Sequence, residues 1–146
     1  MSLRIKLAPY ERFVVNGVGM QNGRYRSELQ FHSWANVLRE KDLIDPAGDL
    51  TPGGRVYLAV QMMILDPSGH EAYVAEFEHR KNELLSVNLN PDINACLERA
   101  GDLVAGNDLY KALGQLRSVI KFEQLLLNHS RLREAMRVPE RLMAAE

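Results

Sequence analysis

A chain of 146 residues has the size of one compact domain, and its formal net charge of −1 excludes a protein that is basic throughout. Hydrophobic residues make up 46% of the chain and charged residues 25%, which is typical of a globular protein and excludes a disordered or fibrous one. Residues 1–44 contain seven basic and four acidic side chains, so the rest of the chain has four more acidic than basic ones. The first part is the better candidate for contact with nucleic acid, although a solvated surface of mixed sign explains the same composition.

The cysteine content and the apolar stretches point to one cellular compartment. Cys96 has no partner for an internal disulfide, which fits a reducing environment. The first residues lack the apolar core of a secretory signal, and the longest apolar stretch, Val56–Leu65, is too short to span a bilayer. We therefore expect a cytoplasmic protein without a membrane segment.

The beginning of the chain has the pattern of short strands. Apolar residues alternate with cations from Leu3 to Leu7, which predicts a half-buried strand, and Arg12–Val15 predicts a second one. Asn16-Gly17 is typical of a hairpin turn because both residues tolerate positive φ, and Asn22-Gly23 repeats this pattern.

Two further strands are predicted before residue 46. Arg24–His32 alternates, with Tyr25, Leu29 and Phe31 on the face expected to point inward. Asn36–Arg39 predicts a fourth strand, and Trp34 before it is expected in the core. Together these segments predict an antiparallel β-meander.

Helical patterns begin after a loop. Proline and glycine residues between Asp45 and Gly54 indicate a linker or an ordered loop. Val56–Leu65 is apolar nearly all round, which predicts a buried helix that ends at Asp66-Pro67. A second helix is expected over about residues 69–88 from its apolar spacing.

Asn90-Pro91 is a helix start signal, and a tight turn at Gly106-Asn107 predicts a pair of helices on either side of it. Residues 125–146 predict one or two more helices with a break near Pro139. The predicted fold is α+β, with a small N-terminal antiparallel β-sheet in residues 1–46 and a helical part in residues 47–146. We expect the helical part to pack as one compact unit, with about the last ten residues frayed.

The motifs that would indicate catalysis fail on inspection. Gly17, Gly19 and Gly23 lack the spacing of a dinucleotide-binding loop, and no helix pattern follows them. His70 would begin a zinc-binding helix only if a second histidine stood four residues later, and none does. Cys96 lies on an apolar helical face, where a packed core residue is expected rather than a nucleophile. No catalytic residue, metal or cofactor is predicted, and an enzyme is the least favoured class.

Cations on two predicted strands form the candidate binding surface. If the first and third strands pair, Arg4 and Lys6 would gather with Arg24 and Arg26 on the outer face. A basic sheet surface can hold an RNA backbone through the release of counter-ions. Binders of single-stranded RNA usually add aromatic stacking platforms, for which the nearby candidates are Trp34, Tyr10 and His32.

Four segments, in order along the chain, match the pattern of one known family. They are Leu7–Gly17, Val37–Asp42, Thr51–Pro67, and Tyr110–Leu113 with Arg117, Ile120 and Glu123. Over about residues 3–125 the sequence thereby resembles the FlbT family of flagellar regulators. The tail after Glu123 has no counterpart in this resemblance.

The resemblance implies a post-transcriptional regulator of flagellin. FlbT proteins associate with the 5′ untranslated region of flagellin mRNA and limit its translation and lifetime, which couples filament synthesis to completion of the basal body. Some members promote flagellin production instead, and they work beside FlaF, a small helical flagellin regulator. The resemblance carries over no residue-level RNA site.

The segment Val37–Asp42 also resembles the last strand of RNA-binding dimers of the carbon-storage-regulator type, where an arginine meets RNA. This second likeness is short, and it adds Arg39, with Lys41 beside it, to the RNA-binding candidates. The alternative is that Arg39 pairs with Glu40 or Asp42 in a surface network.

Two functions follow from these expectations. In the first, the protein regulates translation by binding RNA through Arg4, Lys6, Arg24, Arg26, Arg39 and Lys41. In the second, it is a protein-interaction module whose contact with mRNA is indirect, and an apolar groove beside Tyr73, Phe77 and Leu84 takes a helix of flagellin or of a FlaF-type regulator. A homodimer is a further expectation, because a second chain can cover the edges of a small sheet.

Overall fold

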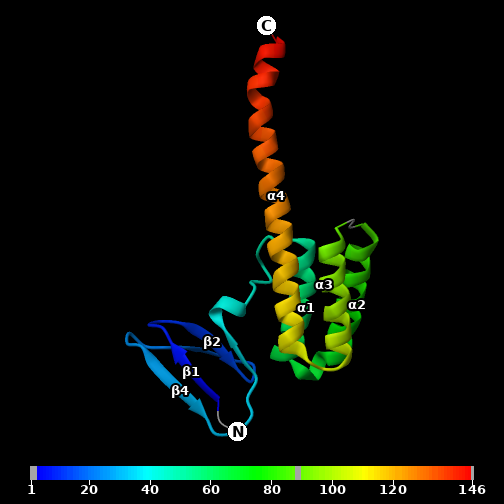
Figure 1. Ribbon diagram of the computed structural model, residues 1–146. Helices are drawn as coiled ribbons and strands as arrows, with labels where there is room; N and C mark the ends of the chain where they lie inside the picture. Colours follow the sequence, from blue (N-terminus) through cyan, green and yellow to red (C-terminus); the bar gives the residue numbers. More distant parts are fainter. Residues whose placement is uncertain (1–2, 88–89, 146) are drawn as a thin grey trace.

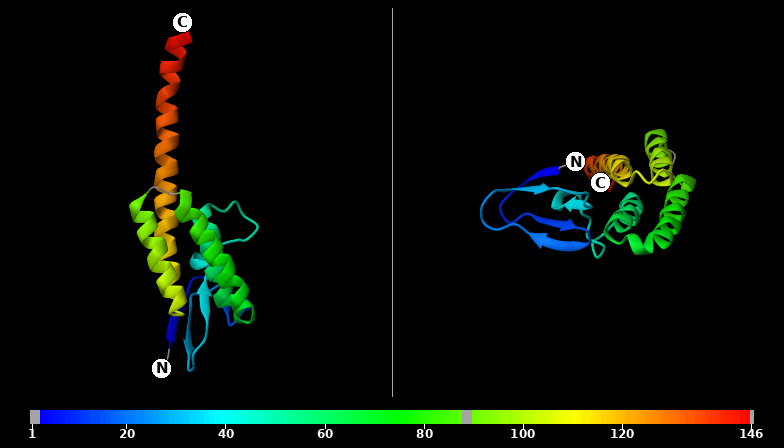
Figure 2. Two further views of the ribbon diagram at one scale, coloured as in Figure 1. Left: turned by 90° about the vertical axis from the view of Figure 1, so that its right-hand side faces the viewer. Right: turned by 90° about the horizontal axis from the view of Figure 1, so that it is seen from below.

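The computed structural model describes residues 3–87 and 90–145, with side chains as far as Met136. Five strands come first and four α-helices follow, so the predicted α+β fold is confirmed (Figure 1). The strands form a module that lies beside a bundle of helices, and one helix projects far beyond the bundle (Figures 1 and 2).

The strands pair in an order that differs from a meander. β1 (Leu3–Leu7) pairs antiparallel with β4 (Ser27–Phe31), whereas β2 (Arg12–Val15) lies between β3 (Val18–Gln21) and β5 (Val37–Arg39). The prediction of a meander is therefore wrong. In β3, Val18 and Met20 alternate with Gly19 and Gln21, but four residues are too short a pattern to indicate a strand, and all four are exposed.

The β1–β4 pair keeps most of the predicted apolar face. Leu3 lies opposite Phe31 and Ile5 opposite Leu29, so their side chains share one face of the sheet. Leu7, at the far end of β1, is buried. This shared face explains why β1 pairs with a strand twenty residues away rather than with β2.

The first Asn-Gly pair makes the predicted hairpin and the second does not. Asn16 and Gly17 have φ values of 50° and 82°, and they connect β2 to β3. A Cβ at Gly17 would lie 2.9 Å from the carbonyl oxygen of Leu65, so the tip of the hairpin also touches the end of a helix. Asn22 continues the β2–β3 ladder instead of turning, because its N–H donates to the carbonyl of Glu11 at 2.9 Å.

Helix α1 (Pro52–Leu65) begins inside the segment expected to be a loop. Thr51 is its N-cap and its side chain accepts a hydrogen bond from the N–H of Gly54. Gly53 and Gly54 therefore lie in the first helical turn rather than in a loop. Gly53 leaves room for the carboxylate of Glu123, which accepts hydrogen bonds from its N–H at 3.0 Å and from the Thr51 hydroxyl at 2.8 Å. As predicted, α1 is apolar nearly all round and ends before Asp66.

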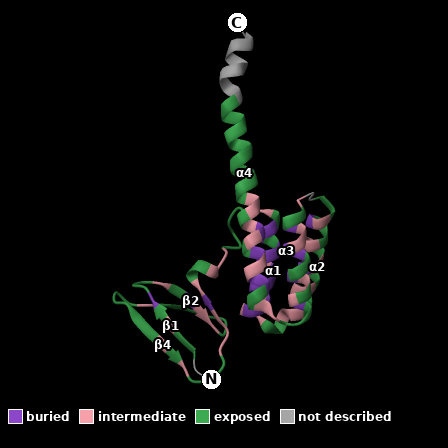
Figure 3. Cartoon of the chain, viewed as in Figure 1, coloured by how far each residue is buried: buried purple, intermediate pink, exposed green. Residues whose placement is uncertain are grey.

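The other helices of the bundle begin and end near the predicted residues. α2 (His70–Val87) follows the 3₁₀ turn η2 (Pro67–Gly69), and α3 (Pro91–Ala105) begins after Asn90, whose side chain accepts hydrogen bonds from two backbone N–H groups. Gly106 ends α3 as expected. Buried residues concentrate in α1, α3 and the adjoining half of the last helix, while the strand module is mostly exposed (Figure 3).

Helix α4 (Leu109–Ala145) is continuous over 37 residues, so the predicted break near Pro139 is absent. Its first half packs on α1 and α3 through Ala112, Leu113, Leu116 and Val119. Glu123 makes the last bonds that we see to α1, and beyond it the helix leaves the bundle (Figure 1).

Polar contacts between described residues join the strand module to the helices. The backbone N–H of Val37 donates to the hydroxyl of Tyr110 at 2.9 Å, and the Arg117 guanidinium lies 3.1 Å from the Asp42 carboxylate in the 3₁₀ helix η1 (Glu40–Asp42). The Tyr57 hydroxyl donates to the carbonyl of Asp42. These contacts fix one edge of the strand module and leave its far end free of the bundle (Figure 1).

Candidate functional site

The outward face of the β1–β4 pair carries charges of both signs. Arg4 and Lys6 project from it as predicted, but the register places Gln30 opposite Arg4 and Glu28 opposite Lys6. The cations expected opposite them, Arg24 and Arg26, are not in the strand, which begins only at Ser27. The outward face is therefore mixed rather than uniformly positive.

Arg24 and its neighbour Tyr25 form an exposed pair at the turn before β4. Tyr25 is 68% exposed, so the prediction that it points inward is wrong. The Arg24 guanidinium lies over its ring, 4.8 Å from the centroid. A cation–π contact of this kind holds the ring in place while its other face stays open to solvent.

Arg39 in β5 is held by a carboxylate from the turn between β1 and β2. Its guanidinium donates to both oxygens of Glu11, at 2.8 Å and 2.9 Å, and also to the carbonyl oxygen of Lys6. The hydrogen bonds from Arg39, together with one from the backbone N–H of Ala8, lower the pKa of Glu11 to about 2. Arg39 was expected to pair with Glu40 or Asp42, or to meet RNA; its partner is instead Glu11.

The two expected partners of Arg39 pair elsewhere. The Glu40 carboxylate lies 3.0 Å from Nε of Arg12, and the Asp42 carboxylate lies 3.1 Å from Nη1 of Arg117. Lys41 is exposed on η1, where its charge further lowers the pKa of Glu11. Arg39 therefore ties β5 to the turn between β1 and β2, whereas Lys41 is an exposed cation on η1.

An open depression of about 410 Å³ lies where β1, β4 and β5 come together. Its lining residues are Lys6, Leu7, Ala8, Arg26, Ser27, Glu28 and Arg39. The structure thus brings three of the six predicted RNA-binding cations to one place, with one carboxylate among them. Arg4 lies farther along the same face of β1, whereas Arg24 lies beside Tyr25 and Lys41 lies on η1.

A second exposed tyrosine lies two residues after Ala8, which lines this depression. Tyr10, in the turn between β1 and β2, has a φ of 60° and is exposed. Asn22 links the two tyrosine loops, because its side-chain amide donates to the carbonyl of Ala8 at 2.8 Å and to that of Tyr25 at 2.9 Å. We call Tyr10, Arg24 and Tyr25 the aromatic tip, which lies at the end of the strand module away from the bundle.

Trp34 is not a core residue. It is 78% exposed in the loop between β4 and β5, so that prediction is wrong as well. Because this loop follows Phe31, which pairs with Leu3, it lies at the opposite end of β4 from the aromatic tip. The alternation of inward and outward side chains along a strand could not predict the burial of Trp34, because Trp34 lies in a loop.

The apolar groove expected on α2 is filled by the protein itself. Phe77 is fully buried and Leu84 nearly so, and both belong to the hydrophobic core. Tyr73 is half-buried and its hydroxyl donates to the Asp66 carboxylate at 2.8 Å. Phe77 is therefore closed to a partner helix in this fold, and Leu84 exposes only a small part of its surface.

The described residues contain no group of three histidine, cysteine or acidic side chains placed to hold a metal. Cys96 is buried, as expected for a core residue, and the Arg99 guanidinium lies 3.4 Å from its sulfur. Over residues 3–87 and 90–145, no helix combines the length and the apolar character needed to cross a membrane.

Comparison with known proteins identifies the family. The model of the flagellar protein FlbT family matches residues 3–127. The chain belongs to the FlbT family. This agrees with the resemblance seen in the four sequence segments.

Curated FlbT relatives span nearly the same length as this chain. A probable flagellum biosynthesis repressor protein FlbT of Caulobacter vibrioides is 39% identical over 129 residues, which cover 88% of this chain and 92% of the relative. The corresponding protein of Rhodopseudomonas palustris is 34% identical over 131 residues, with 88% and 99% covered. A Rhizobium leguminosarum FlbT is 30% identical over 135 residues, with 92% and 90% covered.

These names describe repressors rather than enzymes, in agreement with the expectation of a non-enzymatic regulator. No solved structure matches this chain. The geometry described above is therefore the basis for assigning roles to individual residues in this FlbT protein.

Proposed function

We propose that this FlbT protein is a cytoplasmic post-transcriptional regulator that associates with the 5′ untranslated region of flagellin mRNA and limits its translation and stability. The names of its relatives, which describe flagellum biosynthesis repressors, support a regulatory role in flagellar synthesis. The aromatic tip, next to a depression lined by cations, supports direct contact with a single-stranded message.

The exposed Tyr25 ring carries this proposal. A base can stack on the open face of the ring, while Arg24 behind it strengthens the interaction through its charge. Stacking on an aromatic side chain contributes about 1–3 kcal/mol per base and tolerates any sequence. Lys6 and Arg26 in the neighbouring depression would then hold the backbone phosphates of the same strand.

The charges near the tip set the expected salt dependence. Arg39 is neutralised by Glu11, so the cations open to phosphate on this side are Arg4, Lys6, Arg24 and Arg26. Four phosphate contacts to a single strand predict a slope of about −3 when the logarithm of the binding constant is plotted against that of the salt concentration. A uniformly basic face would have given a steeper dependence.

The test is a titration of flagellin leader RNA with purified full-length protein at several salt concentrations. We expect Tyr25→Ala to weaken binding by about fivefold to a hundredfold, and Tyr25→Phe to retain it because the ring is kept. Arg24→Glu with Arg26→Glu should abolish binding. Trp34→Ala is the matched control, since it removes another highly exposed aromatic ring at the other end of β4.

Two results would refute the assignment. Tyr25→Ala could bind as tightly as the parent, or Trp34→Ala could lose as much affinity as Tyr25→Ala. If the parent itself ignores naked leader RNA but is recovered with flagellin after RNase treatment, the association with mRNA is indirect. The effect on flagellin would then depend on a protein partner such as flagellin or a FlaF-type regulator.

A further inference from the structure

The half of α4 beyond the bundle carries an apolar stripe. Leu125, Leu132 and Met136 are 61%, 60% and 68% exposed. Their spacing of seven and four residues places them along one line of an α-helix. At about 100° per residue, this line lies on the side of α4 opposite the core residues Leu113 and Leu116.

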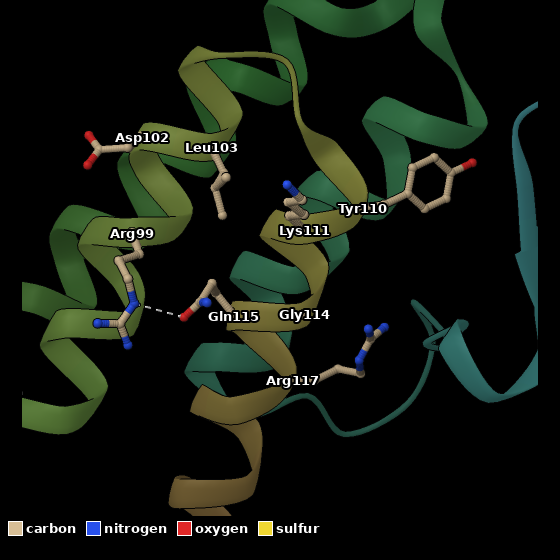
Figure 4. A pocket seen from close by; sticks show the side chains of 8 residues that line it. All are labelled: Arg99, Asp102, Leu103, Tyr110, Lys111, Gly114, Gln115 and Arg117. Atoms are coloured by element: carbon tan, nitrogen blue, oxygen red, sulfur yellow. Dashed lines mark hydrogen bonds between the residues drawn. The ribbon is translucent and has the colours of Figure 1, made fainter.

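The stripe continues into a groove on the bundle. Lys111 and Gly114 lie on the same line of α4, above an open groove of about 720 Å³ between α3 and α4. On one side of this groove, Arg99 donates a hydrogen bond to Gln115 at 3.1 Å (Figure 4). Arg117 extends from the other side of α4 (Figure 4). The stripe and the groove together form a track from Lys111 to Met136, about 37 Å long.

The track is bordered mainly by cations. Lys111, Arg117 and Arg99 lie around the groove, while the Asp102 carboxylate at its margin points away from it (Figure 4). From Lys121 to Met136 the basic residues are Lys121, Arg131 and Arg133, and the acidic residues are Glu134 and Glu123, whose carboxylate is bonded to the start of α1. Two of these cations already have carboxylate partners, Arg117 with Asp42 and Lys111 with Asp108.

This charge distribution selects the kind of partner. Pairing α4 with α4 of a second copy would bring Arg131 and Arg133 of both chains together, which is unfavourable. A helix with an apolar stripe and acidic residues on its flanks matches both the leucines and the cations. The length of the track corresponds to a partner helix of about 25 residues.

We infer that the outward face of α4 is a docking surface for an acidic amphipathic helix of a partner protein. This surface replaces the α2 groove, whose side chains are buried, and it is separate from the aromatic tip. Leu132 and Met136 lie beyond the part of the chain that the FlbT family model matches, which ends at residue 127. Specificity for a partner can therefore differ among family members through this part of α4.

The experiment uses full-length protein and two labelled synthetic helices of 25 residues. Both carry leucines at a heptad spacing, but one has glutamates and the other lysines on the flanks. We expect the acidic peptide to bind at least tenfold more tightly than the basic one in a fluorescence anisotropy titration. Leu125→Asp with Leu132→Asp should weaken its binding at least tenfold.

Leu127→Asp is the matched control. Leu127 is 47% exposed on the same half of α4, but about 150° around the helix from the line of Leu125 and Leu132. Circular dichroism establishes that each variant remains helical. We expect Leu127→Asp to bind the acidic peptide like the parent.

Several outcomes would overturn the inference. If the acidic and the basic peptide bind equally tightly, charge does not select the partner. If Leu127→Asp weakens binding as much as Leu125→Asp with Leu132→Asp does, the binding surface is not confined to the line of Leu125 and Leu132. A dimer that light scattering detects in the parent and not in the Leu125→Asp, Leu132→Asp variant would make the occupant a second copy. Tyr25→Ala is expected to bind the acidic peptide normally, so failure here is distinguishable from failure of the proposed RNA contact.

Discussion

Replacing Gly53 by alanine tests how helix α4 is held against the start of α1. A Cβ at this position would overlap the Glu123 carboxylate and lie 2.9 Å from Cγ1 of Val119. Glu123 would have to leave the N–H of Gly53 and the hydroxyl of Thr51. Hydrogen bonds to a charged group contribute about 1.5–3 kcal/mol each, and a carboxylate at a helix N-terminus contributes about 0.5 kcal/mol more.

Part of this loss is offset, because alanine is up to about 1 kcal/mol better than glycine in a helix. We therefore expect Gly53→Ala to lower the free energy of unfolding by about 2.5 kcal/mol or more, which corresponds to a drop in Tm of about 5–10 °C for a chain of this size. Urea and thermal unfolding followed by circular dichroism measure both quantities.

Gly54→Ala is the control on the neighbouring residue. Its Cβ would lie 3.3 Å from the Thr51 hydroxyl oxygen and 3.5 Å from Cβ of Leu50, so small movements accommodate it. Its stability should stay within about 0.5 kcal/mol of the parent, since the gain in helix propensity offsets the tight contact. Equal unfolding midpoints for the two variants would refute the role assigned to Glu123.

Two further predictions concern one contact inside the strand module and one contact that attaches it to α1. Glu11 has a folded-state pKa of about 2, below its ordinary value of 4.5, so its contribution to stability is complete above about pH 4.5 and is lost as the pH falls towards 2. Glu11→Gln should therefore be about 1–2 kcal/mol less stable than the parent at pH 7 and equal to it near pH 2, as urea unfolding at both pH values would measure; a difference independent of pH would contradict this. Gln61 is buried and its amide bonds both the N–H and the C=O of Ile44, at 2.7 Å and 3.0 Å. Gln61→Leu should cost about 2–3 kcal/mol and speed hydrogen exchange at Ile44, and unchanged exchange there would count against it.

The helices were predictable because their signals are local. Asn90-Pro91 and Gly106 mark helix ends through the backbone conformations that these residues favour, and the all-round apolar character of Val56–Leu65 follows directly from its burial. The Thr51-Pro52-Gly53-Gly54 segment was misleading, because glycine usually indicates a loop. Here Gly53 is required by a carboxylate seventy residues away, which no local pattern contains.

The candidate site was less predictable than the fold. The identity of the cations could be read from the sequence, but which strands pair could not, since the short, exposed strand β3 lies beside β2 and β1 skips to β4. That pairing leaves Arg24 and Arg26 outside the strand and turns Tyr25 outward. The separate pairing of β2 with β5 brings Arg39 close to Glu11, so this candidate RNA-binding arginine is already in an ion pair.

The two ends of the molecule present surfaces of different chemistry. The strand module offers an aromatic surface with a few cations, and the projecting half of α4 offers apolar residues bordered by cations. Partners at these two surfaces need not compete, because the aromatic tip lies at the far end of the strand module and the exposed half of α4 extends beyond the bundle (Figures 1 and 2).

The carboxylate of Glu123 has a consequence for the order in which the chain folds during its own synthesis. The first turn of α1 emerges from the ribosome long before the residue that completes its hydrogen bonds. Until then the leading end of this buried helix has only Thr51 as a cap, and the apolar surface that α4 covers stays open. A nascent chain that a partner binds at this stage would therefore present an incomplete helical bundle. The same holds for a chain on a ribosome that stalls before codon 123.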